Sequence, residues 1–271
     1  MLARLLVAVA LLGVGVGCSG KSDSPGTGAE ALGFPFVSDS IANQLGDANV
    51  IIAIDLGKFG LEKFSSMVPP MLGCVRDILG KVGVAVIGSS DAATHGFITG
   101  IPEEATKKCV GSLAPLVGVK TEDVQGAWQI TAGDDKFQVV WKDGVAHVKD
   151  LAHPAKPGAP NARIRGLVAQ VPKDAWGWIV SGGFPKYKIT QSVAYLTSAP
   201  KVWKLVVTAD SAEPGVAKEW LSGIIKGFKE GAAQKGITVQ DSWFKITETG
   251  TAARLEGEIP DDLFSVPVEA E

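Results

Sequence analysis

The sequence repeats one order of segments on either side of a proline-rich stretch, and this repeat limits the fold more than any other feature. Residues 41–45 precede the apolar run 50–54, and residues 167–171 precede the apolar run 176–180 in the same way. Each pair is typical of an amphipathic turn that leads into a buried strand. In both halves an apolar hairpin, a helix with Pro and acidic residues at its start, and a strand pair containing a tryptophan then follow. We therefore predict a tandem duplication.

The proline-rich stretch at residues 153–160 is the predicted boundary between two domains. Its prolines and its glycine disfavour both a helix and pairing in a sheet. Domain 1 is expected at residues 34–152 and domain 2 at residues 161–271. Both lengths lie in the usual range for a domain.

The segments of the first half follow the order β-α-β-β-α-β. They are a strand at 48–56, a helix at 64–80, strands at 82–88 and 95–101, a helix at 102–117 and a strand at 123–132. This order is that of the ferredoxin-like arrangement, in which both helices cover one face of an antiparallel sheet. In the second half Gly182-Gly183-Phe184-Pro185 replaces the first helix, and an amphipathic helix starting near Val216 ends before Gly236. The expected fold class is α+β, a tandem duplication of two ferredoxin-like-type α/β sandwich modules.

The N-terminus carries one positive charge, Arg4, and then an apolar run that ends at Gly17. This run is too short to span a bilayer and has the length of a signal-peptide core, so residues 1–17 are expected to be removed. The stretch Gly15-Val16-Gly17-Cys18 resembles the bacterial lipobox, although Gly15 stands where a larger aliphatic residue is usual. An ordinary secretory signal is the alternative.

The resemblance to bacterial lipoproteins implies that Cys18 carries fatty acyl chains such as palmitate. Two such hydrophobic groups are enough for stable anchoring of a peripheral protein. Residues 18–33 would form a flexible tether, because they are mostly small and polar. The resemblance implies a location in the cell envelope, with the folded part in the periplasm. Ser19 after the cysteine favours the outer membrane over the inner one.

Net charge argues against a nucleic-acid partner. The whole chain has a formal charge of −3, and loss of Arg4 with residues 1–17 leaves −3 − 1 = −4. Binding of nucleic acid would need clustered Lys and Arg. The partners expected are instead the membrane, through the lipid anchor, and another envelope protein.

Cys74 and Cys109 are the cysteines that remain once Cys18 is acylated. Each lies on the apolar stripe of a predicted helix, and the two helices are expected to be neighbours. A disulfide is therefore feasible in an oxidising periplasm. The alternative is a pair of buried free thiols.

No motif for catalysis, metal binding or a cofactor is found in the sequence. The segment 88–92 lacks the closing glycine of a nucleophile elbow, and Ser198-Ala199-Pro200-Lys201 lacks the companion motifs of the penicillin-recognising serine enzymes. The histidines, His95, His147 and His153, have no metal-ligand spacing, and surface positions are expected for His95 and His153. We therefore expect no enzyme, no metal site and no cofactor.

Aromatic residues are concentrated in the second half, which holds five of the seven tryptophans. Trp176 and Trp178 would face one side of a strand, and Trp203 begins an alternating apolar set. These rings are the candidate surface for a ligand or partner; the alternative is that they pack in the interior. The sequence favours a lipid-anchored, non-enzymatic interaction module of the cell envelope. The alternative function is a carrier of a small apolar molecule, a lipid or a glycan.

Overall fold

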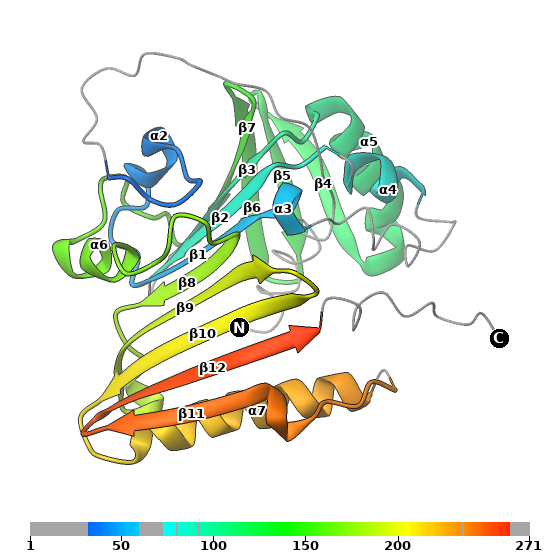
Figure 1. Ribbon diagram of the computed structural model, residues 1–271. Helices are drawn as coiled ribbons and strands as arrows, with labels where there is room; N and C mark the ends of the chain where they lie inside the picture. Colours follow the sequence, from blue (N-terminus) through cyan, green and yellow to red (C-terminus); the bar gives the residue numbers. More distant parts are fainter. Residues whose placement is uncertain (1–31, 60–72, 80, 91–92, 235, 261–271) are drawn as a thin grey trace. The chain divides into compact units, whose positions relative to one another are not determined.

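The computed structural model describes residues 32–59, 73–79, 81–90, 93–234 and 236–260 (Figure 1). The chain divides after Pro160 into two compact units, unit 1 up to Pro160 and unit 2 from Asn161. The predicted signal peptide at 1–17, Cys18 and the tether up to residue 31 lie outside the described residues. Within the described residues, no helix combines the length and the apolar character that crossing a bilayer requires.

Unit 1 is built around one antiparallel sheet with the strand order β1-β2-β3-β7-β6-β5-β4. Its elements are α2 (Asp39–Ala42), β1 (Val50–Asp55), α3 (Leu56–Phe59), α4 (Gly73–Leu79), β2 (Val84–Ser89), β3 (Thr94–Thr99), α5 (Glu103–Leu113), η3 (Ala114–Val117), β4 (Val119–Val124), β5 (Ala127–Ala132), β6 (Asp135–Lys142) and β7 (Val145–Asp150).

Two tight turns set the register of the outer strands in unit 1. Asp143 and Gly144 join β6 to β7 with φ values of 52° and 76°. Gln125 and Gly126 join β4 to β5 with φ values of 51° and 80°. Consecutive positive φ values are those of the two-residue hairpin turns that match the natural twist of paired strands. The Asp-Gly pair is a standard sequence signal for such a turn.

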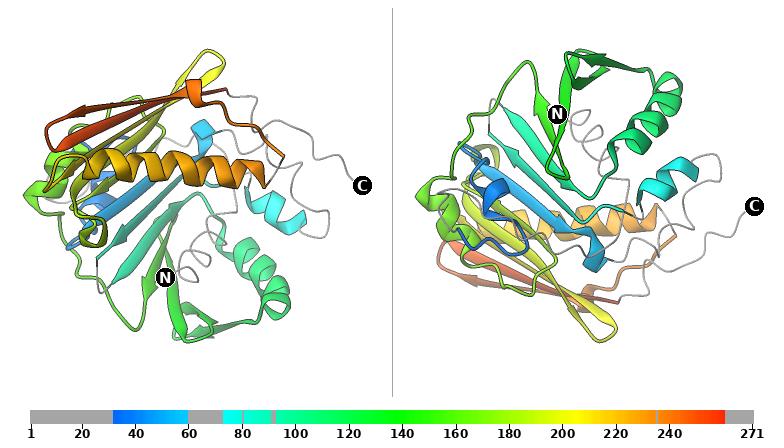
Figure 2. Two further views of the ribbon diagram at one scale, coloured as in Figure 1. Left: turned by 90° about the horizontal axis from the view of Figure 1, so that it is seen from below. Right: turned by 90° about the horizontal axis from the view of Figure 1, so that it is seen from above.

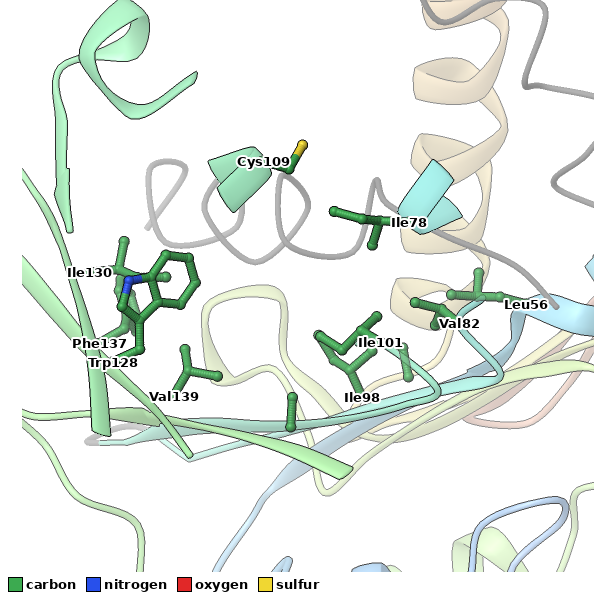
Figure 3. Close-up of a cluster of buried hydrophobic side chains, with 12 residues drawn as sticks. Leu56, Ile78, Val82, Ile98, Ile101, Cys109, Trp128, Ile130, Phe137 and Val139 are labelled. Atoms are coloured by element: carbon green, nitrogen blue, oxygen red, sulfur yellow. The ribbon is translucent and has the colours of Figure 1, made fainter. Parts of the chain in front are cut away.

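The main core of unit 1 lies between its sheet and the helices α4 and α5 (Figure 3). Ile98, Ile130 and Val139 are buried on this face of the sheet, and Figure 3 shows Ile78 of α4 and Cys109 of α5 above it. All five side chains are at most 4% exposed. The alternation of side chains along each strand places these apolar groups on one face.

The predicted α+β class with an antiparallel sheet is confirmed, but the strand order of unit 1 is not ferredoxin-like. In that arrangement the first strand lies between the third and the fourth. Here β1 pairs directly with β2, from Val50 opposite Ser89 to Asp55 opposite Val84. The chain reverses direction between β1 and β2, so the two strands become antiparallel neighbours. The β3 strand then pairs with β7, the last strand of the unit.

Unit 2 also has an antiparallel sheet, with the strand order β8-β9-β10-β12-β11. Its elements are α6 (Ala162–Val168), β8 (Gly177–Ser181), η4 (Pro185–Tyr187), β9 (Ile189–Ala199), β10 (Val202–Ser211), α7 (Val216–Ala233), η5 (Asp241–Trp243), β11 (Phe244–Thr249) and β12 (Ala252–Pro260).

The long helix α7 covers one face of this sheet (Figure 2). Ala217 and Leu221 are 2% and 0% exposed and pack against Val207 of β10 and Leu255 of β12. The amphipathic helix predicted from the sequence is confirmed, and Gly236 follows its end with φ of 72°. Because side chains alternate along a strand, the neighbours of Val207 and Leu255 in sequence point to the opposite face.

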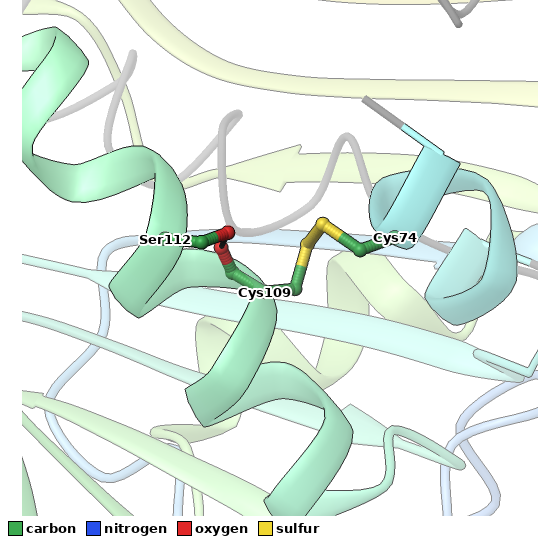
Figure 4. Close-up of a disulfide and its surroundings, with 3 residues drawn as sticks. All are labelled: Cys74, Cys109 and Ser112. Atoms are coloured by element: carbon green, nitrogen blue, oxygen red, sulfur yellow. Dashed lines mark hydrogen bonds between the residues drawn. A yellow bond between two sulfur atoms is a disulfide. The ribbon is translucent and has the colours of Figure 1, made fainter. Parts of the chain in front are cut away.

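Cys74 and Cys109 form a disulfide that joins α4 to α5 (Figure 4). Their Cα atoms are 5.5 Å apart, within the range that disulfides need. The hydroxyl of Ser112 donates a hydrogen bond to the carbonyl oxygen of Cys109 at 2.7 Å. Both cysteines belong to the core of unit 1, so the bond links the two helices at the position where they cover the sheet.

Replacing both cysteines, Cys74→Ala with Cys109→Ala, should lower the free energy of unfolding of unit 1 by about 3–4 kcal/mol. The reason is that the bond closes a loop of 35 residues and thereby restricts the unfolded chain. Denaturant unfolding with and without a reductant measures the effect. In reductant, the parent protein should have the same unfolding midpoint as the double variant. The reductant should not change the midpoint of the double variant. Equal midpoints for all samples would refute the expectation.

Candidate binding groove

The tryptophans singled out in the sequence do not form an exposed surface. Trp176 and Trp178 are 3% and 2% exposed, and Trp203 is half-buried. The rings of Trp176 and Trp203 meet edge to face with their centroids 5.5 Å apart. The structure therefore places Trp176 and Trp178 in the interior, which was the alternative considered for them.

Among the described residues of unit 2, the exposed aromatic side chain is instead Tyr187, which is 51% exposed. The segment Gly182-Gly183-Phe184-Pro185, which ends the regular structure after β8, produces this position. Gly183 has φ of 134°, and a Cβ there would lie 2.7 Å from the carbonyl oxygen of Thr190, so only glycine fits. Pro185 then starts the short η4 turn, which places Tyr187 at its end.

A groove of about 650 Å³ runs between η4 and the first half of α7. Lys186, Tyr187 and Lys188 form one side of it, and Trp220 and Ile224 contribute from the helix. Gly223 also lines the groove, and no atom lies within 4 Å of the position where it would carry a Cβ. We call this the aromatic groove.

The two aromatic residues of the groove have different roles. The Trp220 ring stacks on Phe184 with 5.7 Å between centroids and packs against the core beneath α7. It holds η4 against the helix. Tyr187 makes no comparable packing contact in the described residues and presents its ring to solvent. Tyr187 is therefore the more accessible of the two aromatic rings of the groove.

Lysines and a glutamate surround the groove. The Lys186 ammonium lies 5.6 Å from the centroid of the Tyr187 ring. Lys188 forms an exposed ion pair with Glu213, with Nζ 2.9 Å from Oε1. Glu219 adds a carboxylate on α7. An aromatic ring beside a cation suits a partner with an apolar side chain next to a negative charge.

The groove is lined by aromatic, aliphatic and charged side chains and by one glycine. The residues that line it include no serine, cysteine or histidine, so it lacks a usual nucleophile with a base beside it. Elsewhere in the described ranges, no three His, Cys, Asp or Glu side chains come close enough to hold a metal ion.

The structure corrects the surface position expected for His95. This residue on β3 is 6% exposed, and neither ring nitrogen has a hydrogen bond of good geometry to the described residues. Its ring lies over Gly88, where a Cβ would come within 2.8 Å of it. His153 is exposed as expected, with Nδ1 3.5 Å from an Asp150 oxygen.

Burial lowers the pKa of His95, because the charged imidazolium loses its hydration in the interior. The negative charge of Asp47 and the backbone of Gln44 oppose this effect without overcoming it. Burial also lowers the pKa of His147, whose ring centroid lies 5.1 Å from that of Phe97.

Comparisons with known proteins show a shared fold. No family model matches the chain, and no curated protein matches it either. It is similar to solved structures of TP0453. Crystal form III has a TM-score of 0.52 and 10% identity, over 82% of this chain and 94% of that chain. Crystal form IV has a TM-score of 0.50 and 10% identity, over 83% of this chain and 95% of that chain.

The low pKa of His95 predicts that unit 1 loses stability in mild acid. As the pH falls below about 6.5, the unfolded chain takes up a proton that the folded chain resists, so unfolding becomes more favourable. His95→Gln should reduce the slope of unfolding free energy against pH by up to about 1.4 kcal/mol per pH unit. Denaturant unfolding between pH 5 and about pH 8 measures this slope.

His147 should keep a residual slope in the His95 variant, because burial lowers its pKa too. Identical slopes for the parent protein and the His95 variant would contradict the assignment.

Proposed function

We propose that this protein is a lipid-anchored, non-enzymatic interaction module of the bacterial cell envelope. The anchor rests on the resemblance of Gly15-Val16-Gly17-Cys18 to a lipobox. In this proposal the folded part lies in the periplasm, and the membrane contact is made by acyl chains on Cys18. The observation that carries the interaction role is the exposed Tyr187 beside the aromatic groove.

The composition of the groove supports a protein partner. Tyrosine and tryptophan are enriched where proteins bind one another, and single exposed aromatic anchors often supply much of the binding energy. In this proposal Tyr187 is such an anchor, while Trp220, which lines the same groove, is already held by Phe184. Lys186 next to the ring favours an acidic residue in the partner. We propose a segment of another envelope protein with an apolar and an acidic side chain.

The alternative function, a carrier of an apolar molecule, a lipid or a glycan, has less support. Of the three rings that such a ligand would use, Trp176 and Trp178 are buried and Trp203 is half-buried. The aromatic groove carries the charges of Lys186, Lys188 and Glu219, which an apolar ligand would have to desolvate. A protein segment can satisfy these charges with its own polar groups.

We further propose that the two units arose by duplication of one module. In each unit a short helix and a strand precede a hairpin, β2-β3 or β9-β10, and a helix follows the hairpin. The chain then forms the edge strand, β4 or β11, and returns to pair with the strand before the helix. Unit 1 has one more strand pair in this return path. The ferredoxin-like name does not apply to the repeated module.

Lipid anchoring predicts that Cys18→Ser moves the protein from the membrane fraction to the soluble fraction. The serine cannot form the thioether that holds the diacylglyceryl group, and the remaining contacts with the bilayer would be weak. Fractionation of cells and labelling with an alkyne-bearing palmitate analogue measure the two effects. The double variant of Cys74 and Cys109 serves as the control and should remain labelled. Equal labelling of the parent and the Cys18 variant would refute the anchor.

Docking on the aromatic groove predicts a specific cross-link from position 187. A photoreactive phenylalanine analogue in place of Tyr187, introduced in the producing cells, should give a discrete adduct with one envelope protein. Adding Lys186→Glu should reduce this adduct, because a like charge would then face the acidic partner residue. Affinity purification and mass spectrometry identify the adduct.

The control places the same analogue at Lys142, an exposed position in the β6-β7 hairpin of unit 1. That position should not give the same adduct. The docking proposal fails when position 187 gives no adduct or when both positions give the same products.

A further inference from the structure

Unit 2 has a second concave site, on the sheet face away from α7. It is a hollow of about 290 Å³ next to α6, and it extends over β9, β10, β11 and β12. Thr208 and Arg254 stand opposite each other in the register of β10 and β12, and both line the hollow. Their neighbours Val207 and Leu255 pack against α7. Because side chains alternate along a strand, Thr208 and Arg254 point away from α7. We call this site the polar hollow.

Small side chains leave the space for it. Ala252 lies opposite Asp210, and Thr249 lies opposite Ala252 on the next strand. Both line the hollow together with longer polar residues around them. Leu167 of α6 and Val193 of β9 also line the hollow, but their side chains are only 3% and 2% exposed, so they close its base. The site thus combines a closed base with polar walls.

Two opposite charges line the hollow without pairing with each other in the described residues. Asp210 accepts a hydrogen bond from the Gln191 amide, with 2.5 Å between Nε2 and Oδ2. Arg254 donates from Nε to Glu256 at 2.8 Å. Because Asp210 and Arg254 are diagonal neighbours on adjacent strands, their Cα atoms are about 7–8 Å apart. A small ligand can lie between the two groups.

The charges of the hollow give an anionic ligand no strong attraction. The lining carries one charge of each sign, Asp210 and Arg254, and Arg254 already pairs with Glu256. Lys245 and Lys204 act on Glu256 in turn, so neither sign of charge prevails. A neutral ligand with several hydroxyl groups suits such a surface, because each hydroxyl can both donate and accept.

Neutral polar groups complete the walls. The Thr208 hydroxyl donates to the Val193 carbonyl at 3.4 Å, and the Thr247 hydroxyl donates to the Arg254 carbonyl at 3.5 Å. The Gln170 amide, just after α6, donates to the carbonyl oxygen of Gly166 in that helix at 3.4 Å. All three are long for hydrogen bonds, so a ligand oxygen could replace them at little cost.

We propose that the polar hollow binds one neutral sugar ring. Asp210 accepts hydrogen bonds from two adjacent hydroxyls, in an orientation held by Gln191. The Arg254 guanidinium, which also contacts Glu256 and Tyr195, donates to a third oxygen. This site is separate from the aromatic groove in its residues and does not depend on the proposed protein partner.

The test is saturation-transfer NMR on the purified full chain, held in a detergent that has no sugar headgroup. The probes are glucose, galactose and N-acetylglucosamine, with alanine and glucuronate as zwitterionic and anionic comparisons. At least one neutral sugar should give a saturable signal, and glucuronate should give a weaker one. Asp210→Asn should weaken binding about tenfold or more, since hydrogen bonds to a charged group are the strong ones.

The matched control is Tyr187→Ala in the aromatic groove, which should leave sugar binding unchanged. A far-ultraviolet circular dichroism spectrum equal to that of the parent shows that the Asp210→Asn variant is folded. The proposal is overturned by the absence of a saturable sugar signal, by tighter binding of glucuronate or alanine, or by a sugar signal that Tyr187→Ala abolishes and Asp210→Asn does not. The photo-cross-link from position 187 is a separate experiment. Its absence would refute the proposed protein partner without affecting the proposed sugar site.

Discussion

The alternation of side chains along β10 and β12 is the constraint on which the rest of unit 2 depends. Val207 and Leu255 stand opposite each other and point to α7, while Thr208 and Arg254 beside them point the other way. A slip of one residue in this pairing would place the charge of Arg254 under the helix and expose Leu255. Burial of the apolar set therefore holds the register, and the register assembles the polar hollow.

Local patterns in the sequence predict the elements of this fold better than their order in the sheet. The hairpin expected at 82–88 and 95–101 corresponds to β2 and β3, and the amphipathic helix expected near Val216 is α7. Both depend on neighbours in sequence. The placement of β7 beside β3 depends on residues about fifty positions apart, such as Lys149 opposite His95. Several strand orders bury the same apolar faces, so the pattern alone does not select one.

The candidate sites, too, depend on contacts that the sequence alone does not reveal. The break at Gly182-Gly183-Phe184-Pro185 was visible in the sequence, but only the packing of Phe184 on Trp220 shows that Tyr187 is left exposed. Asp210 and Arg254 come together only through the pairing of β10 with β12. The sequence predicts a surface position for His95, because it does not show that Gly88 lies opposite on β2 and leaves room for the ring.

The two units reach stability in different ways. In unit 1 the described helices over the core, α4 and α5, have 7 and 11 residues, lengths that are marginal for a helix on its own. A disulfide joins them, so each helix limits the motion of the other. In unit 2 one helix of 18 residues carries a continuous apolar face, and the sequence after Pro160 contains no cysteine. Both candidate sites belong to unit 2, whose own fold holds no bond that a change in redox conditions could break. The two candidate sites therefore lie on the unit that folds without a disulfide.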